Sequence, residues 1–168
     1  IQDITPDANE TINGTKKNDS VTTSSGNDRL LLDRGNDYAD AGSGNDYIDG
    51  GAGDDIIVGG SGNDTMLGGR GNNTFRFDLG FGNDSVSSQG GTITLEFSDF
   101  FSPENLVLTQ TNDGNFLLMT NTDGLDSIRL LQDEIDDVTV KFADGTTWST
   151  LTDMVQQFVG TDNSDWFE

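Results

Sequence analysis

Acidic residues with a constant spacing of nine are the clearest chemical signal in this sequence. They are Asp19, Asp28, Asp37, Asp46, Asp55 and Asp64, and Asn73 occupies the next position in the series. Carboxylate and carbonyl oxygens are hard ligands, of the kind that Ca²⁺ takes from proteins. The spacing therefore predicts several calcium ions bound along a regular array.

A nine-residue repeat surrounds these aspartates and is most regular from Ala41 to Asn73. A glycine stands two residues before each acidic position, at Gly44, Gly53, Gly62 and Gly71, and an apolar residue stands two residues after it. The resulting pattern, Gly-Gly-x-Gly-x-Asp-x-apolar-x, is typical of a solenoid. The alternative is a flexible linker rich in Gly, Asn and Asp, but a linker has no reason to keep apolar residues in phase with the glycines.

The repeat also predicts the elements that position the aspartates. One short strand and one turn use nine residues, so a full coil uses eighteen, and residues eighteen apart lie ~4.8 Å apart on adjacent parallel strands. Two columns of carboxylates result. They are Asp28, Asp46 and Asp64 on one side, and Asp19, Asp37, Asp55 and Asn73 on the other. Carboxylates at this separation repel one another unless a cation lies between them. The glycines at the first, second and fourth positions of the repeat are expected to provide positive φ and close approach of backbones.

These residues resemble the RTX, or haemolysin-type calcium-binding, repeats of bacterial proteins that are secreted by the type I route. The resemblance implies a parallel β-roll with calcium ions between its turns. It also implies ligands from the carbonyls of the first four turn positions and from the aspartate at position six of two stacked turns. On this basis the residues assigned to calcium are Asp19, Gly26, Asp28, Gly35, Asp37, Gly42, Ser43, Gly44, Asp46, Gly50, Gly51, Ala52, Gly53, Asp55, Gly59, Gly60, Ser61, Gly62, Asp64, Gly68, Gly69, Gly71, Asn73, Gly82 and Asp84.

The repeat is weaker toward the N-terminus. Thr23-Ser24 and Leu32-Asp33 replace the glycine pair, and Lys17 replaces the third glycine. We expect weaker or missing ions at these turns. The run from Leu30 to Leu32 predicts a strand whose outer face is also covered.

The spacing changes after Asn73, because the next acidic position, Asp84, comes eleven residues later. The segment from Phe75 to Val86 resembles the last turn of many RTX rolls. Its aromatic residues are expected to close the open end of the roll.

Alternating apolar segments replace the nine-residue period from Gly90 onward. They are residues 92–97, 106–110, 116–120, 127–131 and 138–142. This pattern predicts antiparallel strands and hairpins, followed by a short helix between Thr150 and Gly160. The stretch from Asn105 to Trp148 resembles the haemolysin-type calcium-binding-related segment that commonly follows a roll.

The predicted fold is all-β, a parallel β-roll (β-solenoid) of nonapeptide repeats with an antiparallel β cap and one short C-terminal helix. Residues 5–88 form the roll and residues 89–160 the capping segment, and residues 161–168 restart the repeat. A chain that ends in this way is expected to be one unit of an array, with neighbouring repeats of a parent protein as partners.

The charge balance is strongly acidic, with 30 acidic and 8 basic residues among 168 and a formal net charge of −22. Such a charge at low hydrophobicity normally predicts disorder. About six bound calcium ions would reduce the charge to roughly −10. The sequence contains no basic stripe, which argues against nucleic acid and against an anionic membrane surface as partners.

Cysteine and histidine are both absent. Their absence excludes a disulfide framework and thiolate metal sites and removes the commonest general base and the usual zinc ligand. No apolar run approaches the ~18 residues of a transmembrane helix, so we expect no membrane insertion. No signal peptide is visible, which fits export by a route that uses none, or a chain cut from a larger protein. The expected location is extracellular or at the cell surface.

The sequence does not predict an enzyme. Most aspartates occupy a turn position that the repeat already explains, so no carboxylate pair for glycoside hydrolysis is required. A triad lacks its histidine, and no phosphate-binding loop is present. Some RTX proteins carry a self-cleaving Asp-Pro module, but Pro6 and Pro103 follow Thr5 and Ser102.

Two binding alternatives come from residues outside the carboxylate columns. A ladder that includes Asn27 and Asn45 is reminiscent of RTX solenoids that bind ice, but Arg34 and Arg70 stand where such ladders carry threonine. Tyr38 and Tyr47 are expected on opposite sheets, where they could stack on a sugar, although we favour ordinary strand residues.

Two function classes follow. In the first, the chain is a calcium-binding module of a large secreted bacterial protein (toxin, adhesin or exoenzyme). It is disordered without calcium and folds outside the cell, and in transit its partner is the type I secretion apparatus. In the second, it is a carbohydrate- or protein-binding module of a surface adhesin.

Overall fold

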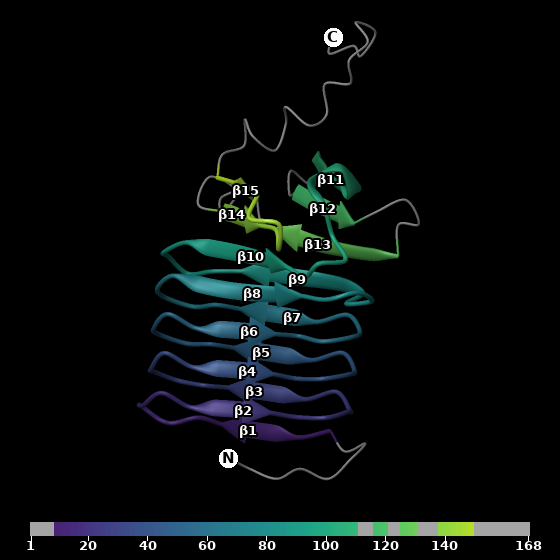
Figure 1. The fold of residues 1–168 in the computed structure, drawn as a ribbon. Helices are drawn as coiled ribbons and strands as arrows, with labels where there is room; N and C mark the ends of the chain where they lie inside the picture. Colours follow the sequence, from purple (N-terminus) through teal and green to yellow (C-terminus); the bar gives the residue numbers. More distant parts are fainter. Residues whose placement is uncertain (1–8, 111–115, 121–124, 131–137, 150–168) are drawn as a thin grey trace, which may run out of the picture.

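A computed structural model gives the fold of the chain and describes residues 9–110, 116–120, 125–130 and 138–149. Apart from one 3-10 turn, all the regular secondary structure of the described residues is β-strand, wound into a stack of coils with later strands at the C-terminal end (Figure 1). The prediction of an all-β solenoid is therefore confirmed. No helix in the described residues is long and apolar enough to span a membrane.

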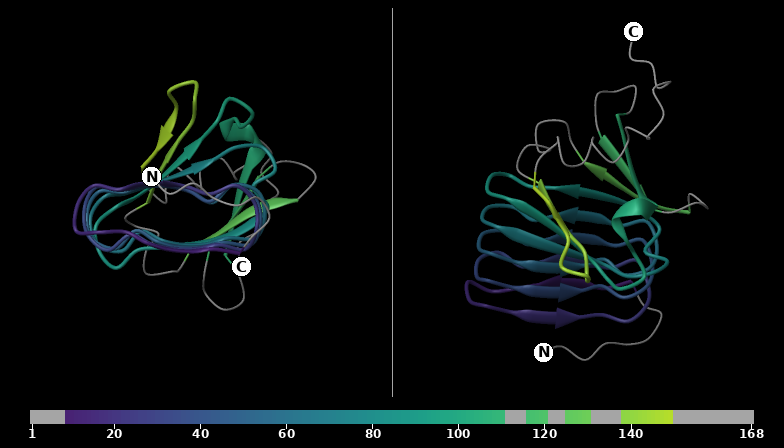
Figure 2. Two further views of the ribbon diagram at one scale, coloured as in Figure 1. Left: turned by 90° about the horizontal axis from the view of Figure 1, so that it is seen from below. Right: turned by 45° about the horizontal axis from the view of Figure 1, so that its top comes forward.

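Short strands separated by turns form the regular part of the roll. They are β1 (Thr11–Asn13), β2 (Ser20–Thr22), β3 (Arg29–Leu31), β4 (Tyr38–Asp40), β5 (Tyr47–Asp49), β6 (Ile56–Val58) and β7 (Thr65–Leu67). Two longer strands follow, β8 (Asn73–Phe77) and β9 (Asn83–Ser87). Odd-numbered strands lie in one sheet and even-numbered strands in the other, so the roll seen end-on is a flattened oval (Figure 2).

The register between neighbouring strands confirms the predicted coil of eighteen residues. Tyr47 pairs with Thr65 in parallel, and Tyr38 pairs with Ile56. The last coil is two residues longer, since Thr65 pairs with Ser85. The change of spacing after Asn73 is thus absorbed by the turn between β8 and β9, and the strands stay in register.

The middle residue of each strand fills the interior of the roll. These residues are Ile12, Leu30, Ala39, Ile48, Ile57, Met66 and Phe75, with Val21 partly buried beside them. Their neighbours on each strand point outward, as side chains must alternate across a strand. The interior is therefore one side chain thick on each sheet.

The three leucines after Arg29 have different environments. Leu30 and Leu32 are both fully buried, whereas Leu31 between them faces outward and is half-buried. Leu32 is already the first turn residue, so the apolar run is a strand residue plus a turn residue that packs inside.

The C-terminal part adds strands to both sheets. They are β10 (Ile93–Phe97), β11 (Leu106–Gln110), β12 (Phe116–Thr120), β13 (Asp126–Leu130), β14 (Val138–Lys141) and β15 (Thr147–Trp148), with a 3-10 turn, η1 (Pro103–Asn105), before β11. The predicted antiparallel pairing is confirmed for β11 with β12, β12 with β13, and β14 with β15. The predicted helix after Thr150 lies outside the described residues.

Parallel pairing also continues beyond the nine-residue repeat. β10 pairs in parallel with β8, β14 with β10, and β13 with β9. Both sheets of the roll are thus extended by strands of the capping segment, which covers the hydrogen-bonding edges that the last coil would otherwise expose. The division at residue 89 stays a prediction.

An aromatic cluster forms a second core beside the last coil. It consists of Phe77, Phe81, Phe97, Phe101, Phe142 and Trp148, all at most 5% exposed. The ring centroids of Phe77 and Phe81 are 4.8 Å apart and those of Phe142 and Trp148 are 4.9 Å apart. Phe77 stands at the first turn position, which Gly59 occupies one coil earlier. This cluster supports the prediction that aromatic residues close the roll.

Candidate metal centre

The aspartates of the repeat form two columns along the roll, as predicted. The Asp46 carboxylate accepts a hydrogen bond from the backbone N–H of Asp28 (2.7 Å), and Asp64 accepts one from Asp46 (2.8 Å). In the other column, Asp55 accepts from the N–H of Asp37 (2.8 Å). Each of these aspartates is no more than 3% exposed. One oxygen of each carboxylate therefore anchors the turn eighteen residues before it.

Asparagines at the preceding position form a ladder in the opposite direction. Asn27 Oδ1 accepts a hydrogen bond from the N–H of Asn45, and Asn45 Oδ1 accepts one from Asn63, both at 2.8 Å. Each turn is thus held by an aspartate from the next coil and an asparagine from the previous one. Since these amide oxygens are engaged within the roll, the ladder does not support the ice-binding alternative.

The second oxygen of each buried carboxylate is the most unusual feature of the turns. Within the described residues, Oδ2 is buried without a hydrogen-bond partner in Asp28, Asp37, Asp46, Asp55 and Asp64. Buried polar atoms are nearly always paired, because an unpaired one keeps the full cost of desolvation. Five such oxygens at the same position of successive turns fit one row of cations along each column.

Burial also changes the acidity of these groups. Desolvation is the main cause that raises the pKa of Asp46 and of Asp55 from 3.8 to about 6, and neighbouring aspartates add to the shift. Desolvation likewise raises the pKa of Asp84 to about 8. The pKa of Asp37 and of Asp64 is raised for the same reason. Without a cation, the fold thus favours the protonated carboxyl.

Protonation at low pH is therefore expected to stabilise the calcium-free fold, and so to replace part of the stabilising effect of calcium. A carboxyl whose pKa is raised by folding stabilises the fold most below its unfolded pKa of 3.8, and that contribution is lost as the pH rises through about 6 for Asp46 and Asp55. Calcium-free protein should therefore show more β-structure at pH 5 than at pH 7.5, as followed by circular dichroism. Less β-structure at pH 5 than at pH 7.5 would contradict the burial of these groups.

The glycines of the turns have two separate roles. Positive φ is found at the second and fourth positions, for example at Gly51 (91°) and Gly53 (145°). The prediction of positive φ at the first position is wrong, because Gly50 and Gly59 do not adopt it. A Cβ at either position would instead collide with Oδ2 of the carboxylate in its own turn, Asp55 or Asp64. The first glycine therefore makes room for the carboxylate.

The second position can be filled without glycine. Asp33 occupies it with a φ of 69°, which makes Asp33 the one non-glycine residue with positive φ among the described residues. Aspartate tolerates this conformation better than most residues do. The replacement of glycine there thus preserves the shape of the turn.

Some carbonyl groups of the turns accept hydrogen bonds from a neighbouring coil, and others do not. Hydrogen bonds between coils end on the second and third positions, such as Gly42 O, which accepts from Ser61 N–H (2.8 Å), and Ser43 O, which accepts from Gly26 N–H (2.9 Å). Among the described turns, none of these amide-to-carbonyl bonds ends on Gly44 or Gly53, at the fourth position, or on Gly50, at the first. These carbonyls and Oδ2 therefore have no hydrogen bond in the roll, while each carbonyl that accepts one hydrogen bond keeps a second lone pair for an ion.

The composition of this donor set favours a hard cation. No group of three or more acidic, histidine or cysteine side chains that could hold a metal occurs in the part of the chain that the structure describes. An ion between these turns would depend on backbone carbonyls with one carboxylate oxygen from each turn that it contacts. Such an all-oxygen set suits calcium.

Asn73 shows what happens when the carboxylate is absent. Its Oδ1 still accepts a hydrogen bond from the N–H of Asp55 (3.0 Å). Its Nδ2, in the place of the second carboxylate oxygen, donates to the carbonyl of Gly71 (3.4 Å). This turn satisfies its fourth-position carbonyl internally, so we expect a weaker site where Gly68, Gly69 and Gly71 supply the carbonyls.

The two ends of the columns differ from the middle. Asp19 accepts hydrogen bonds from the backbone N–H and the hydroxyl of Thr15 (2.6 and 3.0 Å), so its carboxylate already has partners. At the other end, Asp84 accepts from the N–H of Asp64 (2.8 Å), and Ile128 lies beside it in register. Isoleucine therefore replaces the next carboxylate where the capping strands begin.

One carboxylate near the sites was missed by the sequence analysis. Asp126, on β13, accepts hydrogen bonds from the N–H groups of Gly80 (3.2 Å) and Gly82 (2.9 Å). It thereby anchors the last turn of the roll to the capping segment. No repeat phase marks Asp126, so no signal in the sequence could have singled it out.

Comparison with protein families finds one match. Residues 7–39 and 40–75 match the RTX calcium-binding nonapeptide repeat, in four copies. The match ends in β8, so the resemblance of the later residues to the calcium-binding-related segment stays a prediction. No curated protein matches the chain.

Proposed function

Residues 7–75 of this chain belong to the RTX calcium-binding nonapeptide repeat family, and from this premise we propose that the chain is a calcium-triggered folding module. The observation that carries the proposal is the set of five buried carboxylate oxygens without partners, arranged in two columns along the roll. A chain that buries these charges is unstable until cations neutralise them.

The best-equipped turns are residues 50–55 and 59–64, where the first, second and fourth positions are all glycine. There, Oδ2 of Asp55 or Asp64 and the carbonyls of the first and fourth positions would hold the ion. Turn 41–46 has Ala41 in the first position, and the carbonyl of Ala41 accepts a hydrogen bond from the Thr23 hydroxyl (2.5 Å). When bound, calcium supplies the positive charge that lets these carboxylates stay ionised inside the roll.

Because the interior of the roll is thin, the stability of the fold depends on the bound ions. One inward side chain per strand offsets only part of the conformational entropy of ordering. Calcium sites of extracellular type have Kd values of ~10⁻⁴–10⁻³ M. At ~2 mM calcium, each such site adds roughly 0.6–1.8 kcal/mol to the free energy of unfolding, and several sites reach the range of a stable domain.

With these affinities, the module is unfolded at the calcium concentration inside the cell and folded at the concentration outside it. At cytosolic calcium concentrations, far below these Kd values, the sites contribute almost nothing to stability. We propose that the chain stays unfolded inside the cell, passes through a type I secretion conduit as part of a large secreted bacterial protein, and folds outside. Whether that protein is a toxin, an adhesin or an exoenzyme does not affect this mechanism.

A calcium titration of the full chain tests the proposal. Circular dichroism in chelator should show little β-structure at pH 7.5, and calcium at ~0.1–1 mM should produce a cooperative β signal that chelator reverses. Magnesium is the matched control, since it needs a near-octahedral site and keeps its waters, and it should not fold the chain at the same concentration. A full β signal in chelator would overturn the proposal.

A further inference from the structure

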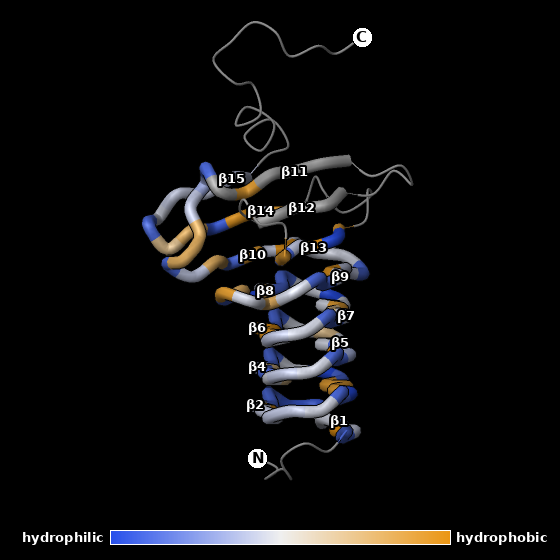
Figure 3. The backbone as a smooth tube through the Cα atoms, turned by 90° about the vertical axis from the view of Figure 1, so that its right-hand side faces the viewer, coloured by the Kyte–Doolittle hydropathy of each residue, from blue (hydrophilic) through white to orange (hydrophobic). Residues whose placement is uncertain are grey.

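A groove lies where the narrow roll meets its wider C-terminal end. Figure 3 shows β8 and β10 reaching beyond the narrow stack formed by β2, β4 and β6. The hollow beneath this step has a volume of about 330 Å³ and is lined by residues of β4, β6, β8 and β10, together with Asp78 and Ser98. A second hollow of about 190 Å³ shares Val58, Arg76 and Asp78 with it and extends toward Leu79, which is 60% exposed.

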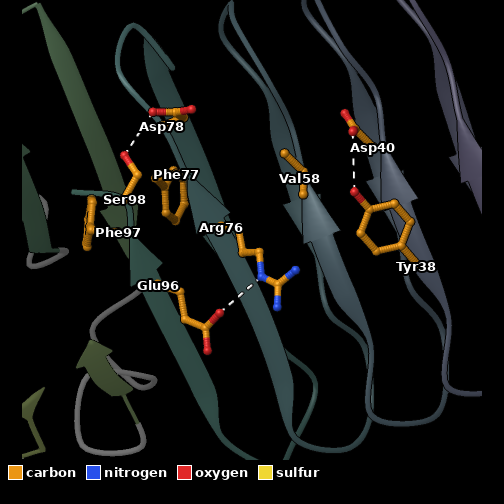
Figure 4. A pocket seen from close by; sticks show the side chains of 9 residues that line it. All are labelled: Tyr38, Asp40, Val58, Arg76, Phe77, Asp78, Glu96, Phe97 and Ser98. Atoms are coloured by element: carbon orange, nitrogen blue, oxygen red, sulfur yellow. Dashed lines mark hydrogen bonds and ion pairs between the residues drawn. The ribbon is translucent and has the colours of Figure 1, made fainter. Parts of the chain in front are cut away.

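The polar side chains of the groove are held in pairs (Figure 4). Arg76 Nε donates to Glu96 (3.0 Å), Ser98 Oγ donates to Asp78 (2.8 Å), and the Tyr38 hydroxyl donates to Asp40 (3.3 Å). The register places Asp40, Val58, Arg76 and Glu96 in one outward column across four strands. Charged side chains thus lie on both sides of the apolar Val58 in a fixed row beside an aromatic ring.

Tyr38 differs from the tyrosine at the same repeat position on the opposite sheet. The guanidinium of Arg29 lies 4.1 Å from the ring centroid of Tyr47, so a cation covers that ring. The Tyr38 ring lies in the groove with its hydroxyl on Asp40, and Val58 on the neighbouring strand continues the apolar floor (Figure 4). Tyr38 therefore combines an uncovered aromatic ring with a hollow.

We infer that this groove binds a neutral saccharide. Sugar rings present an apolar face, which an aromatic ring can contact, and hydroxyl groups that both donate and accept. The hollow has the size of a small-ligand site, for which ~300 Å³ is the lower end. A formal charge of −22 disfavours anionic saccharides. A basic peptide is disfavoured because Glu96 is already shared by Arg76 and by Lys141 (3.7 Å).

This inference goes beyond the folding module and requires only that the roll be folded. The test uses the full chain in calcium and saturation-transfer difference NMR with neutral oligosaccharides of glucose, mannose, galactose and N-acetylglucosamine. At least one of these oligosaccharides should bind, and the substitution Tyr38→Ala should weaken its affinity about tenfold. Tyr47→Ala, at the same repeat position on the other sheet, is the matched control and should bind as the unmodified chain does.

Circular dichroism of every sample keeps the two proposals apart. If the chain folds without calcium, the folding proposal fails and the saccharide test still stands. If the Tyr38→Ala variant loses its β signal, the variant Arg76→Gln on β8 is used in its place, and its saccharide affinity is compared with that of Tyr47→Ala. Absence of binding by all the neutral oligosaccharides, or equal loss in Tyr47→Ala, overturns the inference. So does binding of alginate or polylysine in the groove in their place.

Discussion

Replacing Gly53 by alanine is expected to destabilise the calcium-loaded roll by roughly 4 kcal/mol, which is near the upper limit for a single substitution. Gly53 has a φ of 145°, and a Cβ there would overlap the backbone carbonyl oxygen of Gly35 in the neighbouring coil. Backbone cannot move aside as a flexible side chain can. The coils must therefore separate at this point, and every hydrogen bond between the two turns is affected.

Gly90→Ala is the matched control for this substitution. Gly90 also has positive φ (125°), but a Cβ there has no other atom within 4 Å. Its replacement should cost only the conformational penalty, about 1–2 kcal/mol. Urea unfolding in calcium, followed by circular dichroism, measures both variants. If Gly53→Ala costs no more than Gly90→Ala, the close stacking of turns does not limit the stability of the roll.

Replacing Asp55 by asparagine is expected to change stability in opposite directions with and without calcium. Asparagine keeps the hydrogen bond to the turn below, as Asn73 shows in the same column, but removes a buried charge and a ligand oxygen. At ~2 mM calcium the variant should lose roughly 1–4 kcal/mol, because an interior aspartate faces turns on both sides and two sites are weakened. Without calcium, the loss of a desolvated charge should favour folding.

Asp54→Asn provides a control with the same change of charge. Asp54 is exposed, and its carboxylate accepts a hydrogen bond from the N–H of Asn72 (2.8 Å). One coil earlier, the side-chain oxygen of Asn36 accepts the equivalent hydrogen bond from the N–H of Asp54 (3.1 Å). Asparagine fits that ladder, so the expected change is within about 0.5 kcal/mol in calcium.

Two measurements distinguish the variants. Urea unfolding reports stability in calcium, and in chelator the concentration of trimethylamine oxide that folds the chain reports the calcium-free state. Isothermal titration calorimetry then counts the ions. Equal loss of stability for Asp55→Asn in both conditions would mean that its carboxylate has a purely structural role in the turn.

The sequence by itself determined the coil of the roll and the positions of its carboxylates. A strand and a turn of constant length require residues eighteen apart to stack, so the register of Tyr47 with Thr65 and the contact of Asp46 with Asp28 follow from the repeat alone. The capping strands were also predictable within a residue or two, since β11 and β12 keep the alternation that a two-sided sheet imposes.

Only the tertiary structure decided how the individual atoms of the turns are used. The repeat places Asp55 over a turn, but the contacts between coils determine that one of its oxygens is bonded while the other is buried without a partner. The same contacts show that Gly50 makes room for this oxygen and has no need of positive φ. Local propensity cannot separate these two roles of glycine, because both permit the same residue.

The non-repetitive contacts were beyond the sequence for a different reason. Asp126 reaches the amide of Gly82 across 44 residues, and β14 continues a sheet in parallel with β10 across more than forty. The groove beside Tyr38 exists because β8 and β10 are longer than β4 and β6 and project beyond them. Such contacts depend on how segments far apart in the sequence pack against each other, and the nine-residue repeat contains no information about that packing.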